Sequence, residues 1–175
     1  MDGGREGEEL EVHVRRLGIA LGVALATTFA GARADAQRYR VMVASETGQR
    51  SVIEFRPCIP AEGSGCGAWI DREAVADTAI RLAPSTGARF GPADSVWIDR
   101  GAIRIRSADG RSKTIRDPRG AATTLALAPM RDYAFVVLRK LDATESTVVM
   151  VDLSTRSVIA NCPIAERAYA VAVIR

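Results

Sequence analysis

The sequence predicts a mainly β fold, formed as a small antiparallel sheet or sandwich or from propeller-like hairpins, with one short helix near residues 71–82. Short runs of apolar, often β-branched residues recur along the chain, and polar turns separate them. Only one stretch has helical spacing instead. Hydrophobic residues make up 47% of the 175-residue chain and charged residues 26%, which indicates a globular protein and excludes a disordered one.

The N-terminal region has the features of a secretory signal peptide. Arg15 and Arg16 precede an apolar run over residues 17–30. A membrane-spanning helix needs ~20 apolar residues, and this run is shorter. A signal peptide is therefore favoured over the alternative, a membrane anchor.

The expected cleavage site follows this run. Ala34 and Ala36 form the small-x-small pattern of a signal-peptidase site, and Gln37 comes next. We therefore expect residues 1–36 to be a signal peptide and residues 37–175 to be a single β-rich domain. Export places this domain in the periplasm or the extracellular medium, with no membrane span after cleavage.

All three cysteines lie in the exported region, where the compartment is oxidising. Cys58 and Cys66 bracket a segment rich in Pro, Gly and Ser, which can bend to bring two cysteines together. We predict a structural Cys58–Cys66 disulfide that leaves Cys162 as a buried thiol beside Pro163. The alternative pairs Cys162 with one of the other two cysteines. We expect no zinc site, because a fourth thiol, a histidine and a CxxC pair are missing.

Three segments have the pattern of a β-hairpin, in which two apolar runs flank a polar turn. They are residues 41–55, 102–115 and 148–160. Within the second segment, Asp109-Gly110 is the strongest turn signal, because glycine tolerates a positive φ. Further strands are expected at residues 95–99, 123–128, 133–139 and 169–174.

The expected helix covers residues 71–82, where three apolar residues fall on one helical face. Asp71 is placed to cap its first turn, and Pro84 stops the pattern. The following residues, 83–94, contain two prolines and are expected to form a loop.

A tetrapeptide, Trp-Ile-Asp-Arg, occurs at residues 69–72 and again at residues 97–100. Two interpretations stay open. The repetition is either a coincidence or a duplicated edge or corner in which each tryptophan caps a sheet. The aromatic residues as a group either pack in the core, which is the favoured use of so few of them, or line a ligand face.

The C-terminal part contains a strand-like run that ends at Pro129, a second run over residues 133–137, and Val151-Asp152-Leu153-Ser154-Thr155-Arg156 before a third run. In this order, residues 124–175 resemble a blade of the bacterial YVTN or surface-type β-propeller repeat proteins. Propellers need at least four blades of ~40 residues, and the exported region has room for about three. We favour a small sandwich or open barrel with propeller-like hairpins. The alternatives are a propeller completed by a second copy and a truncated propeller fragment.

The exported region lacks the residues for several kinds of catalysis. The one histidine, His13, precedes it, so a Ser-His-Asp or Cys-His site is excluded. The glycines at residues 63–67 have no lysine after them, so no phosphate-binding loop is indicated. We expect no catalytic residues, no cofactor and no metal. A hydrolase that uses acidic residues is the alternative, and its candidates are Asp71, Glu73, Asp77, Asp94, Asp99 and Asp109.

These observations favour an exported, non-catalytic binding or scaffold module with an unknown ligand; a truncated β-propeller fragment and an exported hydrolase are the alternatives. Residues 37–175 are mildly basic, which suits a soluble exported protein and slightly favours anionic partners. Arg104 and Arg106 alternate with Ile103 and Ile105, which indicates a solvated strand face rather than a nucleic-acid patch. We expect the partner to be a protein or an envelope component, not a nucleic acid. The sequence leaves the oligomeric state open.

Overall fold

The computed structural model describes residues 38–57, 67–71 and 80–174, all of which belong to one compact unit, Arg38–Arg175. The signal peptide, its cleavage site at Ala34, Ala36 and Gln37, and the Cys58–Cys66 pair lie outside the described residues and stay predictions. Within the described ranges, no helix has the length and apolar character needed to cross a membrane.

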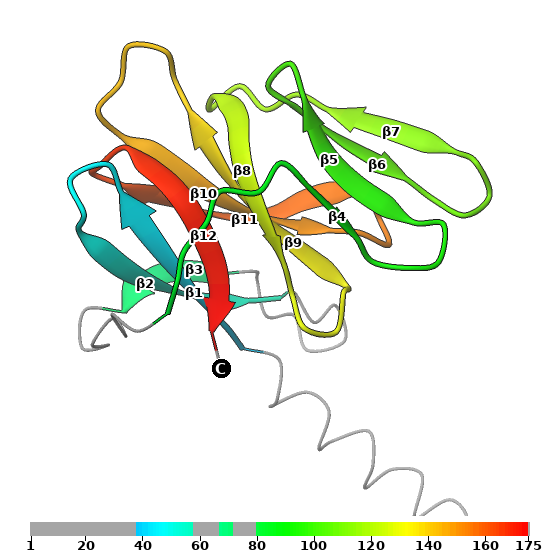
Figure 1. The fold of residues 1–175 in the computed structure, drawn as a ribbon, viewed down its shortest axis with the longest axis horizontal. Coiled ribbons are helices and arrows are strands. Elements are labelled where there is room, and N and C mark those ends of the chain that lie inside the picture. The colour runs from blue at the N-terminus through cyan, green and yellow to red at the C-terminus, as the bar shows by residue number, and fades with distance from the viewer. Residues whose placement is uncertain (1–37, 58–66, 72–79, 175) are drawn as a thin grey trace, which may run out of the picture. The chain divides into compact units, whose positions relative to one another are not determined.

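The described residues form three antiparallel sheets of four strands each, which resemble the blades of a propeller (Figure 1). Sheet A has the order β12-β1-β2-β3 and contains Ala168–Ile174, Tyr39–Ser45, Arg50–Arg56 and Gly67–Asp71. Sheet B has the order β11-β10-β9-β8 and contains Ser157–Ile164, Ser146–Asp152, Tyr133–Arg139 and Ala121–Leu127. Sheet C has the order β4-β5-β6-β7 and contains Gly87–Arg89, Ser95–Asp99, Ala102–Arg106 and Ser112–Ile115.

The mainly β fold and the three predicted hairpins are confirmed. The hairpins are β1-β2, β6-β7 and β10-β11. The four further strands expected from the sequence are β5, β8, β9 and β12. The sequence pattern did not predict that β12 pairs with β1, so that the last strand and the first lie side by side in sheet A (Figure 1).

The predicted helix is wrong at both ends that the structure describes. Asp71 is the last residue of β3, where it pairs with Val52, and residues 80–82 are not helical. The rest of the stretch, 72–79, lies outside the described residues. The Asp71 carboxylate accepts a hydrogen bond from Arg40 of β1, two strands away in the sheet, instead of capping a helix. At Asp71, strand pairing with β2 thus takes the place of the predicted helix cap.

The predicted loop at residues 83–94 is also corrected, because it contains β4. Gly87 pairs with Trp97, and Arg89 pairs with Ser95. A three-residue strand is too short to show an alternating pattern, so only its partner in the folded chain reveals it. Just before β4, Ser85 binds the edge of sheet B, where the Leu125 amide donates to the Ser85 carbonyl at 2.8 Å.

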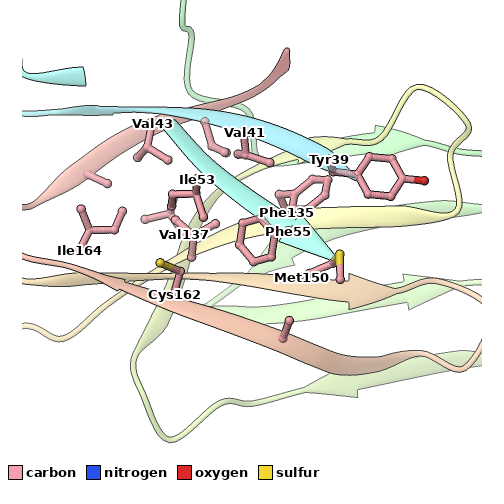
Figure 2. Close-up of a cluster of buried hydrophobic side chains, with 14 of the residues drawn as sticks. Tyr39, Val41, Val43, Ile53, Phe55, Phe135, Val137, Met150, Cys162 and Ile164 are labelled. Carbon is pink, nitrogen blue, oxygen red and sulfur yellow. The ribbon is translucent and has the colours of Figure 1, made fainter. Parts of the chain in front are cut away.

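Sheet B is the central layer, and each of its faces contributes to one apolar cluster. Phe135 and Val137 pack against sheet A, whereas Ala134 and Val136 pack against sheet C. Figure 2 shows the first cluster, where the rings of Phe55 and Phe135 lie 5.1 Å apart. Sheet B is therefore apolar at consecutive positions rather than at alternate ones.

Sheets A and C each bury one face against sheet B. The predicted core positions on their strands and on β10 are confirmed as buried: Val41, Val43, Ile103, Ile105, Val149 and Val151. Since successive side chains of a strand point to opposite faces, the residues between these positions in sheets A and C point away from sheet B. We call these two surfaces the outer face of sheet A and the outer face of sheet C.

A two-residue turn holds sheet C on the edge of sheet B. Arg100 and Gly101 join β5 to β6 with φ values of 49° and 72°. The Gly101 carbonyl accepts a hydrogen bond from the Ala122 amide at 2.9 Å. A Cβ at Gly101 would lie 2.8 Å from the Cβ of Ala121, so this close approach requires glycine.

Candidate functional site

The tryptophan and the aspartate of the repeated Trp-Ile-Asp-Arg tetrapeptide lie on the outer face of a sheet in both copies, on an edge strand in sheet A and on an inner strand in sheet C. Trp69 and Asp71 lie on β3, the edge strand of sheet A. Trp97 and Asp99 lie on β5 of sheet C, and each alternates with a residue that packs towards sheet B. The repetition therefore places a tryptophan and an aspartate together on each outer face, next to arginines of the neighbouring strands.

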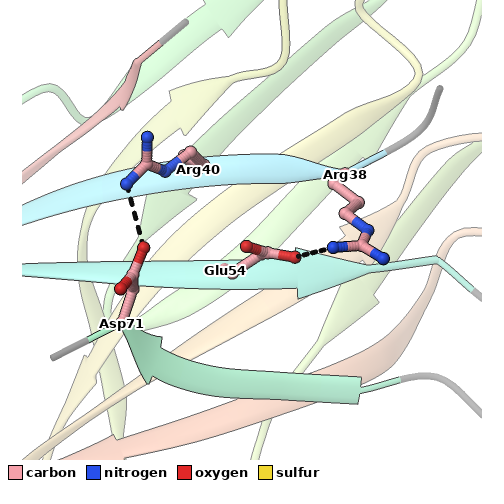
Figure 3. Close-up of polar contacts among 4 residues, drawn as sticks. All are labelled: Arg38, Arg40, Glu54 and Asp71. Atoms are coloured by element: carbon pink, nitrogen blue, oxygen red, sulfur yellow. Dashed lines mark hydrogen bonds and ion pairs between the residues drawn. The ribbon is translucent and has the colours of Figure 1, made fainter. Parts of the chain in front are cut away.

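On the outer face of sheet A, three arginines have partners, and Figure 3 shows two of them, Arg38 and Arg40. Arg40 Nη2 lies 2.9 Å from Asp71 Oδ2, and Arg38 Nη1 lies 3.3 Å from Glu54 Oε1. The Arg56 guanidinium lies 5.5 Å from the centre of the Trp69 ring, within the range of a cation–π interaction. Two of these arginines thus have a carboxylate partner within the sheet, and the third has an aromatic partner.

The same face is closed at its centre. Met42 and Val52 pair across β1 and β2 and are both buried. Arg50 lies close to them, since its Nη1 atom is 3.9 Å from the Met42 sulfur and donates to the Ile80 carbonyl at 3.0 Å. Little apolar surface is left there for a ligand.

The outer face of sheet C has a row of arginine and serine side chains that crosses all four strands. Arg89, Ser95, Arg106 and Ser112 are consecutive cross-strand partners. Arg89 and Arg106 are exposed. In the part of the chain that the structure describes, neither arginine has a carboxylate within ion-pair distance.

A second row on this face centres on Trp97. Its cross-strand partners are Gly87 on one side and Arg104 on the other. Arg104 Nε lies 2.8 Å from Asp99 Oδ2, so this arginine is paired. Gly87 has no side chain, and it therefore leaves one flank of the half-buried indole without a cross-strand neighbour.

Another basic region lies around a hollow of about 150 Å³ at one end of sheet B, lined by Arg119, Leu138, Lys140, Ala143, Glu145 and Thr147. Arg119 donates to both carboxylate oxygens of Asp117, at 2.7 and 2.6 Å. These hydrogen bonds outweigh burial and hold the pKa of Asp117 below its usual value. Arg119 is thus used to hold the β7–β8 connection, and a ligand would have to compete with Asp117 for it.

Tyrosines and acidic residues gather at the start of β1 and in the turns of sheet B, but they serve structure. The Tyr39 hydroxyl donates to Asp132 at 2.9 Å, and burial together with this carboxylate raises the Tyr39 pKa. Burial opposes ionisation of Asp152, yet hydrogen bonds from Ser154 and Thr155 outweigh it and lower the Asp152 pKa. Both carboxylates therefore already bind protein donors. Asp152 stabilises a turn of sheet B, and Asp132 links sheet B to sheet A.

The described acids that the sequence offers for hydrolysis do not come together as one group. Asp71 is in sheet A, whereas Asp99 is in β5 of sheet C. Asp94 and Asp109 lie in turns of sheet C, where each accepts a backbone hydrogen bond. The two other candidates, Glu73 and Asp77, lie outside the described residues. Within the described ranges, no group of three His, Cys, Asp or Glu side chains is placed to hold a metal ion.

Cys162 is a free thiol at the edge of the cluster between sheets A and B (Figure 2). It is 4% exposed, and burial raises its pKa. The thiol is therefore protonated and shielded, which suits a core residue rather than a nucleophile.

Sequence reasoning identified part of the outer face of sheet C. Arg106 was expected on a solvated strand face, and its exposure confirms this. Arg89 was missed, because its strand was expected to be a loop. The repeated tetrapeptide was the one signal that pointed to Trp97.

The chain matches no protein-family model, no curated protein and no solved structure. Its fold places it among all-β proteins formed from propeller-like, four-stranded antiparallel sheets.

Proposed function

We propose that this protein is an exported, non-catalytic binding or scaffold module whose binding surface is the outer face of sheet C. The observation that carries the proposal is the pair of exposed arginines, Arg89 and Arg106, which lack carboxylate partners in the described chain and lie in the row next to the half-buried Trp97. Unpaired arginines next to an aromatic ring are typical of a recognition surface.

The backbone beneath this face is held in place, which supports binding. Val96, Ile103 and Ile105 on the opposite face of β5 and β6 are at most 1% exposed and pack against sheet B. A surface on such a sheet loses little conformational entropy when a ligand binds, because its backbone is already ordered.

Export is the second part of the proposal. The arginine pair, the apolar run and the Ala34–Ala36 site support a signal peptide. The intact mass of protein recovered from the periplasm or medium should correspond to a chain that begins at Gln37. Recovery of the uncleaved chain from the membrane fraction would contradict export.

The propeller-like sheets and the motifs of residues 124–175 support a resemblance to the blades of the surface-type β-propeller repeat proteins. Such proteins use repeated four-stranded sheets as frameworks for surface recognition. A truncated propeller fragment stays the alternative to a small independent module.

The binding function is tested by incubating the purified protein with isolated envelope polysaccharides and envelope proteins, while released sugars and peptides are measured. We expect retention on at least one fraction, loss of retention in an Arg89→Gln/Arg106→Gln variant, and no release of products. Release of products by the wild type would instead support the hydrolase. Equal retention of the variant would show that another surface binds.

A further inference from the structure

The arrangement of the outer face of sheet C limits the chemistry of its ligand. Arg89 and Arg106 are both partners of Ser95, so two strand spacings, roughly 10 Å, separate their backbone positions. A guanidinium binds a carboxylate through two parallel hydrogen bonds. The face therefore suits a ligand whose carboxylates recur at intervals along an extended chain.

The second row of the face adds contacts for uncharged groups. Trp97 is a half-buried indole with no side chain opposite it at Gly87, and the negative face of an aromatic ring attracts the weakly positive C–H groups of a sugar ring. Ser95, Ser112 and Thr114 offer hydroxyls on the same surface, and these can both donate to and accept from sugar hydroxyls.

If sheet C is the binding surface, as proposed above, its chemistry indicates the ligand class: we infer that the outer face of sheet C binds an acidic polysaccharide. Its carboxylates pair with Arg89 and Arg106, and one of its sugar rings stacks on Trp97. Arg104 completes the surface, although Asp99 neutralises it in the free protein.

Nucleic acid fits this face less well. Proteins that bind single strands stack successive bases on several aromatic side chains, and the strands of sheet C place one aromatic residue, Trp97, on this face. Duplex DNA carries a charge every ~1.7 Å of its axis, and tight binding needs many cations. Arg89 and Arg106, whose backbone positions lie roughly 10 Å apart and which have no carboxylate partner among the described residues, suit the wider spacing of sugar carboxylates better.

The test uses polygalacturonate oligomers as the acidic probe and the fluorescence of Trp97 as the readout. The chain has two tryptophans, so Trp69→Phe leaves Trp97 as the single reporter. In the full chain with this substitution, we expect a saturable change that weakens as salt is added. Fully methyl-esterified oligomers, which lack the charge, should bind at least tenfold more weakly.

Variants decide which face is responsible. Arg89→Gln/Arg106→Gln should weaken binding about tenfold or more, since charge pairs are lost. The matched control, Arg38→Gln/Arg40→Gln on sheet A, removes the same charge and should leave affinity within about twofold. Thermal unfolding verifies that both variants are folded.

Three results would overturn the inference. They are equal binding of the esterified oligomers, equal weakening by the sheet A variant, and tighter arginine-dependent binding of single-stranded DNA of matched charge. If an envelope protein binds through Arg89 and Arg106 while polygalacturonate does not, the inference is wrong and the proposed binding function stands.

Discussion

The outer faces of sheets A and C contain the same tetrapeptide but differ in the charge they present. In sheet A, Asp71 and Glu54 lie within ion-pair distance of Arg40 and Arg38. In sheet C, Asp99 neutralises Arg104 alone, and a row with two exposed arginines lies beyond it. Whether a strand arginine is available to a ligand thus depends on the carboxylates that other strands of its sheet place within reach and not on its own segment.

The largest expected effect comes from the two clusters that support these faces. Phe135→Ala removes a ring from the cluster beneath sheet A, and Leu138→Ala removes apolar volume from the cluster beneath sheet C. Phe135→Ala should lower the free energy of unfolding by about 3–5 kcal/mol, and Leu138→Ala should lower it by about 2–5 kcal/mol. Urea denaturation measures these losses.

The same urea denaturation also shows whether sheets A and C unfold in one cooperative transition. Trp69 reports on sheet A and Trp97 on sheet C, and single-tryptophan variants separate their fluorescence. We expect coincident transitions, because sheet B contributes to both clusters. Separate transitions would show that the faces unfold independently.

The turn that holds sheet C on sheet B should tolerate substitution poorly. Gly101→Ala should cost more than the ~1–2 kcal/mol of a left-handed residue, because the new methyl group would collide with Ala121. Gly110→Ala is the matched control, since φ is 78° there but nothing lies within 4 Å of the added Cβ. Equal losses of stability in chemical denaturation would argue against the close approach at Gly101.

The Asp117–Arg119 pair makes the β7–β8 connection sensitive to pH. The pKa of Asp117 is lowered in the folded state, so its stabilisation is present above the unfolded pKa of about 4 and is lost as the pH falls through the folded value. Asp117→Asn should cost about 1–3 kcal/mol at pH 7 and progressively less in acid. Asp142→Asn, at an exposed position, should change little at any pH. A loss for Asp117→Asn that is constant between pH 7 and pH 2 would contradict this account.

The smallest expected effect concerns the aspartates of the repeated tetrapeptide. Asp99→Asn frees Arg104 and should strengthen polygalacturonate binding about threefold, in line with the ~0.2–1 kcal/mol of an exposed ion pair. Asp71→Asn is the equivalent change in sheet A and should leave this binding unchanged. Titrations of the two variants at one salt concentration make the comparison, and a stronger gain in Asp71→Asn would reverse the roles of the faces.

Local pattern was sufficient where two strands that are consecutive in the sequence meet through a short polar turn. The β6-β7 and β10-β11 hairpins followed from alternating or continuous apolar runs around polar turns. It failed at β3 and β4, where the pairing of Asp71 with Val52 and of Gly87 with Trp97 depends on distant segments. The pairing of β12 with β1 joins the two ends of the domain and leaves no local signal.

The candidate site shows the same limit. Arg106 was recognisable as exposed, because it alternates with buried isoleucines. That Arg89 is its neighbour across Ser95, and that neither has a carboxylate partner in the described chain, follows only from the strand register. Single-sequence patterns therefore predicted the strand but not the combination of residues on its surface.

The most direct test of the central claim is an NMR titration of the full chain with polygalacturonate oligomers. Its two tryptophans give two indole N–H signals, one from the outer face of each outer sheet. We predict that the Trp97 signal and the side-chain Nε–H signals of Arg89 and Arg106 shift in a saturable way, while the Trp69 signal stays in place. Equal shifts of both indole signals, or a shift of Trp69 alone, would contradict the assignment of the binding surface to sheet C.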